Sequence, residues 1–261
     1  MTTTITSPQN PKLKLARALG GRPKERREAG AFLAEGVRLV EEAFAANWSF
    51  RFALYSDKLS ERGRELVRKL ESKSIDVESV EGGLLQSLSE TETSQGILAV
   101  LNDSQLPIPK SPNFILIPDS IRDPGNLGTL LRSAQAAGVQ AVFLPPETTD
   151  VFAPKVVRAG MGAHFRLPMQ AMSWEEIRRV SASARLIVYL ADGEGGSCWE
   201  TDLRAPLALI LGGEAEGASQ AARNLAGGRV SIPMPGGAES LNAAVAGSVL
   251  LFEVVRQRRA D

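Results

Sequence analysis

The residues best suited to chemistry lie in three loops of the C-terminal half of the chain. The loops are Pro118–Thr129, with Arg132 shortly after it, Gly212–Gly217, and Ile232–Asn242. Each follows an apolar run that is typical of a buried strand. They carry amide, hydroxyl, carboxylate and guanidinium groups, together with glycines that let a backbone approach a ligand closely. These groups suit the binding and orientation of a ligand.

Several of these side chains also have a purely structural explanation. Asn126 fits the N-cap of the following helix, and we favour that role for the residue taken alone. Ser240 also fits an N-cap, although Ala243 at the third helical position precludes a capping box, and Asn242 is less easily explained by capping. Arg132 lies about 140° around its helix from the apolar stripe. It therefore points to solvent, to a cleft or to a partner chain, and solvent is the ordinary outcome for a surface arginine.

The three loops contain no pairing of a nucleophile with a base. The single histidine, His164, lies outside them, and we interpret it as structural or at the surface. Cys198 has no basic residue within three positions that would favour a thiolate. One cysteine and one histidine do not make a zinc site of the usual kind. The loop at Gly212 is neither GxGxxG nor a phosphate-binding loop, which disfavours a nucleotide-dependent oxidoreductase. Chemistry without a covalent intermediate or a metal is favoured.

The elements that must position these loops indicate an α/β protein. Short apolar runs alternate with helical patterns, and uninterrupted apolar strands between helices predict a parallel sheet covered on both faces. Ligands of such sheets bind beyond the carboxyl ends of the strands. The expected strands are 52–55, 96–101, 114–117, 141–144, 186–190, 207–211 and 229–233, and the expected helices are 37–46, 61–72, one around 127–134 and 242–258.

Three prolines within residues 107–112 predict a linker, because proline favours extended chain. We therefore expect a smaller α/β domain over residues 1–106 and a larger one over 113–261. The chain has 261 residues, of which 43% are apolar, and it shows no membrane-length apolar run and no signal-peptide pattern. With its single cysteine, it is expected to be cytoplasmic.

The charge pattern leaves two interpretations of the N-terminus open. The formal net charge is zero, which is mild evidence against a nucleic-acid partner. Residues 1–28 nevertheless carry seven Lys/Arg against two Glu, a local net charge of +5. Such a segment either neutralises phosphates or is a solvated leader, and charge alone does not decide between them.

Taken together and in order, the three loops resemble the SpoU (TrmH-like) branch of the SPOUT RNA methyltransferases. The matching motifs are Asp123–Arg132, Leu211–Gly217, and Ile232–Met234 followed by Ser240–Asn242. Residues 154–163 also fit, with Gly160 where the family often has serine. The first part of the chain resembles the family's L30e-like substrate-binding domain at residues 7–11, 32–40 and 93–97.

The resemblance implies a fold, a reaction and an assembly. The C-terminal domain would contain a trefoil knot, and the enzyme would be a homodimer with its site at the interface. It would transfer a methyl group from S-adenosylmethionine to a ribose 2′-hydroxyl of structured RNA, ribosomal RNA being favoured over transfer RNA. A non-catalytic RNA-binding protein with the same fold is the main alternative, and a methyltransferase acting on a base or on a protein is another.

The resemblance also assigns roles to residues. The expected catalytic residues are Arg132, Asn126, Glu214, Ser240 and Asn242. The expected cofactor-binding residues are Gly212, Gly213, Ile232, Met234 and Leu241. The expected RNA contacts are Lys12, Lys14, Arg17 and Arg38, and no metal is expected. For Arg132, the roles of base and of electrostatic stabiliser both remain open.

Overall fold

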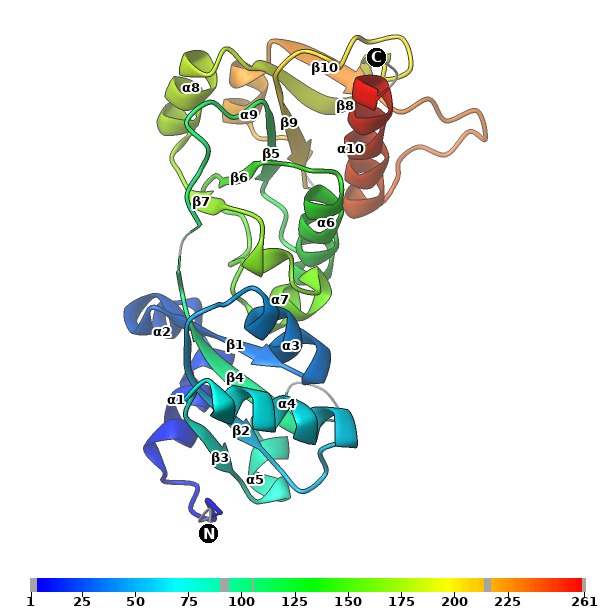
Figure 1. Cartoon of the computed structure of the whole chain (residues 1–261). Helices are drawn as coiled ribbons and strands as arrows, with labels where there is room; N and C mark the ends of the chain where they lie inside the picture. Colours follow the sequence, from blue (N-terminus) through cyan, green and yellow to red (C-terminus); the bar gives the residue numbers. More distant parts are fainter. Residues whose placement is uncertain (1–3, 90–93, 105, 214–216, 260–261) are drawn as a thin grey trace. The chain divides into compact units, whose positions relative to one another are not determined.

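The chain folds into two compact units, each with its own sheet (Figure 1). The computed structural model describes residues 4–89, 94–104, 106–213 and 217–259. The first unit comprises Met1–Ser104 and Asp150–Phe165, and the second comprises Gln105–Thr149 and Arg166–Asp261. Residues 107–112, the predicted linker, form no helix or strand. Within the described ranges, no helix is long and apolar enough to cross a membrane.

The first unit is built on a mixed four-stranded sheet in the order β1-β4-β2-β3. β4 runs antiparallel to both of its neighbours, whereas β2 and β3 are parallel. The strands are β1 (Ala31–Glu35), β2 (Phe50–Tyr55), β3 (Val77–Ser79) and β4 (Ile97–Asn102). The helices are α1 (Pro11–Gly20), α2 (Pro23–Ala29), α3 (Val37–Ala45), α4 (Glu61–Ser72), α5 (Gly82–Gln86) and α7 (Pro154–Gly160).

Apolar side chains on both faces of β4 contribute to two separate cores, one on each face of this sheet. Ile97, Ala99 and Leu101 point into a core shared with α3 and α4. Leu98 and Val100 point into the core shared with α1 and α5. Because successive side chains of a strand point to opposite faces, this central strand must be apolar throughout.

The segment Asp150–Phe165 contributes to the first unit, although it lies between two strands of the second in sequence. Phe152, Val157 and Phe165 pack into the core around Phe32, with the Phe32 and Phe152 ring centroids 4.7 Å apart. Among the contacts of this segment is also an ion pair in which Nε of the buried Arg26 donates to Oδ2 of the partly buried Asp150 at 2.7 Å. The proline-rich linker instead predicts this segment within the domain over residues 113–261.

The second unit contains a six-stranded sheet in the order β10-β8-β9-β5-β6-β7. All neighbouring pairs are parallel, which confirms the predicted α/β class and parallel sheet. The strands are β5 (Phe114–Asp119), β6 (Ala141–Leu144), β7 (Met169–Ala171), β8 (Ile187–Ser197), β9 (Leu207–Gly212) and β10 (Gly228–Ser231). The helices are α6 (Pro124–Ala136), α8 (Trp174–Ser183), α9 (Gln220–Leu225) and α10 (Ala243–Arg259).

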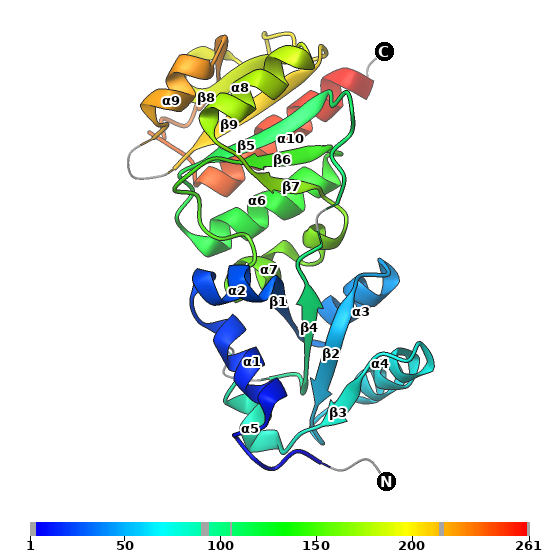
Figure 2. The same ribbon diagram turned by 90° about the vertical axis from the view of Figure 1, so that its left-hand side faces the viewer.

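Helices cover both faces of this parallel sheet (Figure 2). Ile177 of α8 and Ala222 of α9 are buried against one face. α6 and α10 pack together on the other, where Ser248 Oγ donates to Ser133 Oγ at 2.7 Å. A Cβ on Gly247 of α10 would lie 2.5 Å from side-chain atoms of both Leu130 and Leu211, so glycine permits this close packing.

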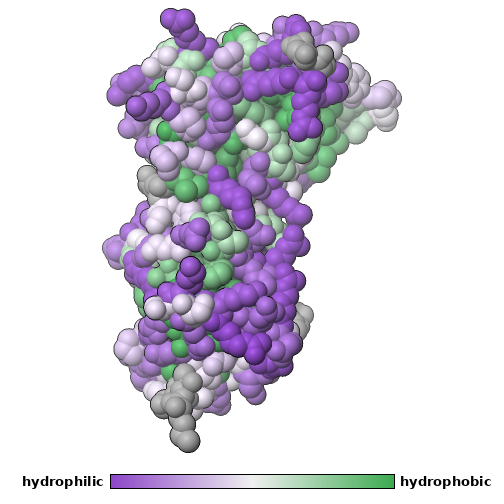
Figure 3. Space-filling model, viewed as in Figure 1, coloured by the Kyte–Doolittle hydropathy of each residue, from purple (hydrophilic) through white to green (hydrophobic). Residues whose placement is uncertain are grey.

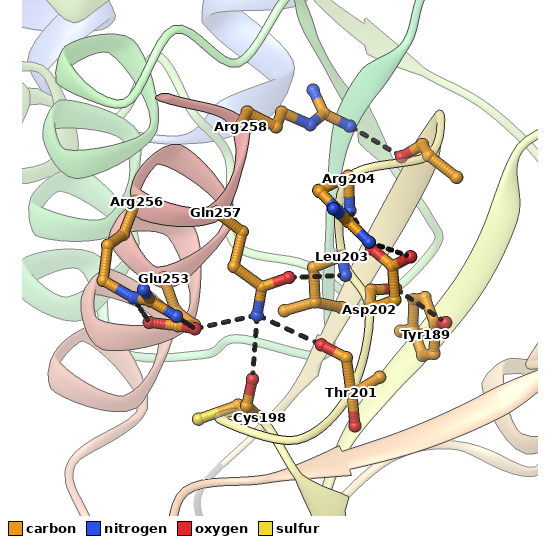
Figure 4. A network of polar contacts seen from close by, with 11 residues as sticks. Tyr189, Cys198, Thr201, Asp202, Leu203, Arg204, Glu253, Arg256, Gln257 and Arg258 are labelled. Atoms are coloured by element: carbon orange, nitrogen blue, oxygen red, sulfur yellow. Dashed lines mark hydrogen bonds and ion pairs between the residues drawn. The ribbon is translucent and has the colours of Figure 1, made fainter. Parts of the chain in front are cut away.

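The C-terminal end of α10 is fastened to the turn that follows β8 (Figure 4). Gln257 Nε2 donates to the carbonyl oxygens of Cys198 and Thr201, both at 3.1 Å. Its Oε1 accepts from Leu203 N at 2.8 Å. One amide side chain thereby satisfies three backbone groups, which fixes α10 against the sheet.

Candidate active site

A cavity of about 380 Å³ opens at the carboxyl ends of β9 and β10, beside residues 191–193 in the middle of β8. Its lining includes all five residues expected to bind the cofactor: Gly212, Gly213, Ile232, Met234 and Leu241. Ser240 and Asn242 line it as well. The position agrees with the general rule that ligands of parallel α/β sheets bind beyond the strand ends.

The two glycines at the end of β9 are required by close backbone packing. A Cβ on Gly212 would lie 2.6 Å from Ala218 N, and one on Gly213 would lie 2.5 Å from the carbonyl oxygen of Ser120. Contacts this short with backbone leave no room for a side chain. The glycines therefore bring two strand ends and a returning loop together at the cavity.

Asn242 and Asn126 meet at the mouth of this site and connect the first and third loops. Asn242 Nδ2 donates to Asn126 Oδ1 at 2.9 Å. Asn242 Oδ1 accepts from the backbone N–H groups of Ala244 and Val245 at 3.0 and 3.2 Å. Asn242 is thus the N-cap of α10, and its amide group is oriented by the helix that it caps.

These contacts correct two predictions about helix caps. Asp123, not Asn126, caps α6, because Asp123 Oδ1 accepts from Asn126 N at 2.7 Å. Pro124 at the first helical position accounts for this boundary. Asn242 takes the role that Ser240 was expected to have at the start of α10. Ser240 is exposed and lines the cavity instead.

Arg132 lies on α6, away from the apolar side of the helix, as predicted. Its side chain is exposed, and it forms no ion pair with any residue in the described ranges. It is not among the residues that line the cavity of its own chain. Glu214, the fifth expected catalytic residue, lies outside the described residues.

The two reactive side chains that the sequence analysis set aside are buried. His164 Nε2 lies 2.7 Å from the carbonyl oxygen of Val151, and burial lowers the pKa of this histidine to about 4. Burial also raises the pKa of the Cys198 thiol, which disfavours a thiolate. Neither residue lines the cavity.

Two aspartates of the parallel sheet, Asp119 of β5 and Asp192 of β8, were missed by sequence reasoning. Asp119, the last residue of β5, is buried, and its Oδ2 accepts from Ser219 N at 2.6 Å. It thereby holds the turn that leads into α9. Asp192 lines the cavity from β8. Position at the end of an apolar strand was the available signal for Asp119, whereas no local pattern marks Asp192.

The predicted RNA contacts all lie in the first unit but differ in their surroundings. Lys14 and Arg17 are exposed and lie three residues apart on α1. Lys12 forms ion pairs with Asp76 and Glu78. Arg38 is exposed and lines a separate cavity of about 190 Å³.

The fold is that of an α/β protein with a cavity at the ends of parallel strands. The second and third loops line this cavity, and the first loop is joined to it through the hydrogen bond between Asn126 and Asn242. A family model described as the SpoU rRNA Methylase family matches residues 113–252, and one described as an MRM3-like substrate binding domain matches residues 10–99. The chain belongs to the SpoU rRNA methylase family.

Relatives and solved structures agree with this assignment over almost the whole chain. A 23S rRNA (uridine(2479)-2′-O)-methyltransferase of Streptomyces viridochromogenes is 36% identical, over 97% of this chain and 92% of that one. The 23S rRNA (guanosine(2553)-2′-O)-methyltransferase RlmP of Bacillus subtilis is 32% identical, over 96% and 98%. The AdoMet-bound rRNA methyltransferase of Sinorhizobium meliloti superposes with a TM-score of 0.85 at 30% identity, covering 97% of both chains.

Proposed function

We propose that this protein transfers the methyl group of S-adenosylmethionine to a ribose 2′-hydroxyl of ribosomal RNA. The observation that carries the proposal is the pair Asn126–Asn242, which lies at a strand-end cavity lined by all five expected cofactor-binding residues. The relatives described above are named as 2′-O-methyltransferases of 23S rRNA. Their names specify a uridine and a guanosine, so membership in the family does not specify the target base.

The cavity suits a nucleoside cofactor held mainly by backbone groups. Its volume of about 380 Å³ lies in the range of small-molecule sites. Gly212 and Gly213 present peptide groups without side chains, and Ile232, Met234 and Leu241 supply apolar surface. When bound there, S-adenosylmethionine supplies an electrophilic methyl group on its sulfonium.

The chain's own residues orient the ribose and stabilise the charge that develops on it. Asn126 and Asn242, held together and fixed by the α10 cap, are placed to hydrogen-bond a ribose hydroxyl. Arg132 stabilises the developing alkoxide or holds the adjacent phosphate, because a guanidinium is a permanent donor and not a base. As the methyl group moves from sulfur to the ribose oxygen, the hydroxyl proton passes to that RNA phosphate or to water. Arg132→Ala should abolish turnover and leave the affinity for S-adenosylmethionine nearly unchanged, as measured by calorimetry.

The proposed assembly is a homodimer in which Arg132 serves the partner's cavity. Val245, Val249 and Phe252 form an apolar stripe on α10, with 48%, 38% and 48% of their surfaces exposed. Apolar surface is visible in the region of α10 (Figure 3). α6, which carries Arg132, packs beside α10. A second copy would cover the stripe, and Arg132 of each chain would then lie at the cavity of its partner.

Mixing two inactive variants tests this assembly. Arg132→Ala and Asn126→Ala should each be inactive as homodimers. In a mixed dimer, one site would combine an intact Asn126 with the partner's intact Arg132. Mixing at equal concentration, with subunit exchange, should restore roughly a quarter of wild-type activity, since half the dimers are mixed and one of their two sites is complete. No restoration despite proven exchange would place Arg132 in the site of its own chain.

The first unit is proposed to bind the RNA. Lys14 and Arg17 share one face of α1 and remain exposed, as phosphate contacts require. The ion pairs of Lys12 favour a structural role for it, whereas Arg38 stays a candidate. The double variant Lys14→Gln/Arg17→Gln should weaken RNA binding and reduce its salt dependence, without changing the affinity for S-adenosylmethionine. The trefoil knot and the cytoplasmic location also stay proposals.

Analysis of the methylated nucleoside tests the reaction. The protein is incubated with labelled S-adenosylmethionine and unmodified ribosomal or transfer RNA, and the RNA is then digested to nucleosides. A 2′-O-methylnucleoside from ribosomal RNA supports the proposal, whereas a base-methylated nucleoside contradicts it. Binding of RNA without any transfer of methyl would favour the non-catalytic alternative.

A further inference from the structure

β8 leaves its ladder with β10 at the edge of the cavity. Between Arg229 and Val230 of β10, the paired residue on β8 jumps from Leu190 to Gly196. Residues 191–195 therefore bulge out of the sheet. The first three of them line the cavity described above, whereas the last two line a separate hollow. The bulge is thus a wall of the cofactor cavity.

The bulge presents one carboxylate to the cavity, and several groups hold it in place. The side chain of Asp192 is 17% exposed. Its Oδ2 lies 3.8 Å from Arg223 Nη1 and 3.6 Å from Arg229 Nη1. Its Oδ1 accepts from Glu194 N at 3.0 Å. A carboxylate has about four acceptor positions, so these contacts orient the group and leave capacity to accept a further hydrogen bond. Arg223 and Arg229 line the neighbouring hollow, so they contact Asp192 from outside the cavity.

The two arginines come from different elements, and each is tied to the surrounding structure. Arg223 of α9 also donates from Nε to the carbonyl oxygen of Ala218, next to the glycine loop, at 3.2 Å. Arg229 of β10 also contacts Glu194 at 3.3 Å. The position of Asp192 is therefore coupled to β8, α9 and β10 at once.

We propose that Asp192 binds the ribose hydroxyls of the nucleoside cofactor, and that Arg223 and Arg229 are the residues that position it. Among the residues that the structure describes, most of the remaining lining is backbone and apolar or small side chains, and the other carboxylate on it, Glu239, is exposed. Two neighbouring hydroxyls can donate to one carboxylate, and an acidic residue beyond a parallel strand is a general means of holding ribose. The inference rests on the proposed function, because that function supplies the nucleoside.

Calorimetry with three ligands tests the inference. S-adenosylmethionine carries both a ribose and an ammonium group, 5′-methylthioadenosine keeps the ribose and lacks the amino acid, and 2′-deoxy-5′-methylthioadenosine also lacks one hydroxyl. Asp192→Ala should weaken the binding of the first two ligands by a similar factor, about tenfold or more. The deoxy ligand should bind wild type more weakly than its parent, and Asp192→Ala should weaken its binding by a smaller factor, because only one of the two hydroxyls remains to donate.

Asp202→Ala is the matched control, because Asp202 is also ion-paired with an arginine, Arg204, but lines neither the cavity nor the hollow beside the bulge. It should bind all three ligands like wild type. Equal affinity of wild type and Asp192→Ala for 5′-methylthioadenosine would overturn the inference. If affinity for S-adenosylmethionine alone then fell, the ammonium group would be the partner of Asp192.

The comparison of the two methylthioadenosines uses wild-type protein and so does not depend on how the variant folds. Equal binding of both by wild type would also overturn the inference. If wild type bound neither S-adenosylmethionine nor 5′-methylthioadenosine, the proposed cofactor would fail as well. If wild type bound both ligands and Asp192→Ala bound them with the same affinity as wild type, this inference alone would fail.

Discussion

Asn242 combines a structural contact with a proposed catalytic one, and two substitutions separate them. Asn242→Ala removes both the N-cap of α10 and the hydrogen bond to Asn126. Loss of a cap costs about 1 kcal/mol of the free energy of unfolding, and loss of a partly exposed hydrogen bond adds a similar or smaller amount. We expect a total loss of about 1–2 kcal/mol for this variant.

Asn242→Asp keeps the capping oxygen and places a negative charge at the start of α10, which the helix dipole favours. Its stability should therefore stay within about 0.5 kcal/mol of wild type. The variant nevertheless lacks the donor that meets Asn126 Oδ1 and sets a carboxylate against that oxygen. We expect the methyl-transfer rate to fall about tenfold or more, equivalent to at least ~1.4 kcal/mol of activation free energy.

Urea unfolding measures the first quantity, and single-turnover methyl transfer at saturating cofactor measures the second. We expect Asn242→Asp to unfold at the same urea concentration as wild type and to transfer the methyl group more slowly. A variant that is stable and as fast as wild type would refute the proposed role of the amide pair. An unchanged stability of Asn242→Ala would refute the assignment of the cap.

Three other perturbations test the fold and the cavity. Gly212→Val should abolish cofactor binding in calorimetry, because a Cβ there would lie 2.6 Å from Ala218 N; retained affinity would contradict the close packing. Arg26→Met leaves the partly buried Asp150 carboxylate without its buried partner and should cost about 1.5–3 kcal/mol in urea unfolding; a loss below about 1 kcal/mol would contradict this. Burial lowers the pKa of His164 to about 4 from an unfolded value near 6.5, so the neutral form is favoured in the fold. The contribution of His164 to the free energy of unfolding should be fully present above pH 6.5 and fall by about 2 kcal/mol when the pH is lowered to 5. His164→Gln should remove this part of the pH dependence of the free energy of unfolding.

The sequence predicted the elements whose patterns are local. The helix expected over 61–72 is α4, with Ser60 as its cap, and the apolar runs at 114–117 and 207–211 are β5 and β9. α8 was missed, although Ser173 and Glu176 form a capping box that marks its start. The cap of α6 was misassigned even though Pro124 was a usable signal for Asp123.

Contacts between distant parts of the chain could not be inferred from such patterns. Phe152 and Phe32 are in contact but are separated by 120 positions in sequence, so nothing local assigns residues 150–165 to the first unit. Asp192 depends on Arg223 and Arg229, which reach it from other elements. The five residues expected to bind the cofactor line one cavity, and the sequence grouped them because their motifs follow apolar strands in a recognisable order.

Mapping of the transferred methyl group is the most direct test of the central claim. Unmodified 23S ribosomal RNA is methylated with labelled S-adenosylmethionine by wild type and by Asn242→Asp, and alkali-resistant linkages are then located. A 2′-O-methyl group blocks alkaline cleavage at its own linkage. Our account predicts label at one alkali-resistant linkage with wild type, and the same linkage labelled more slowly with the variant. Label on RNA in which every linkage remains alkali-sensitive would contradict it, because the methyl group would then be on a base.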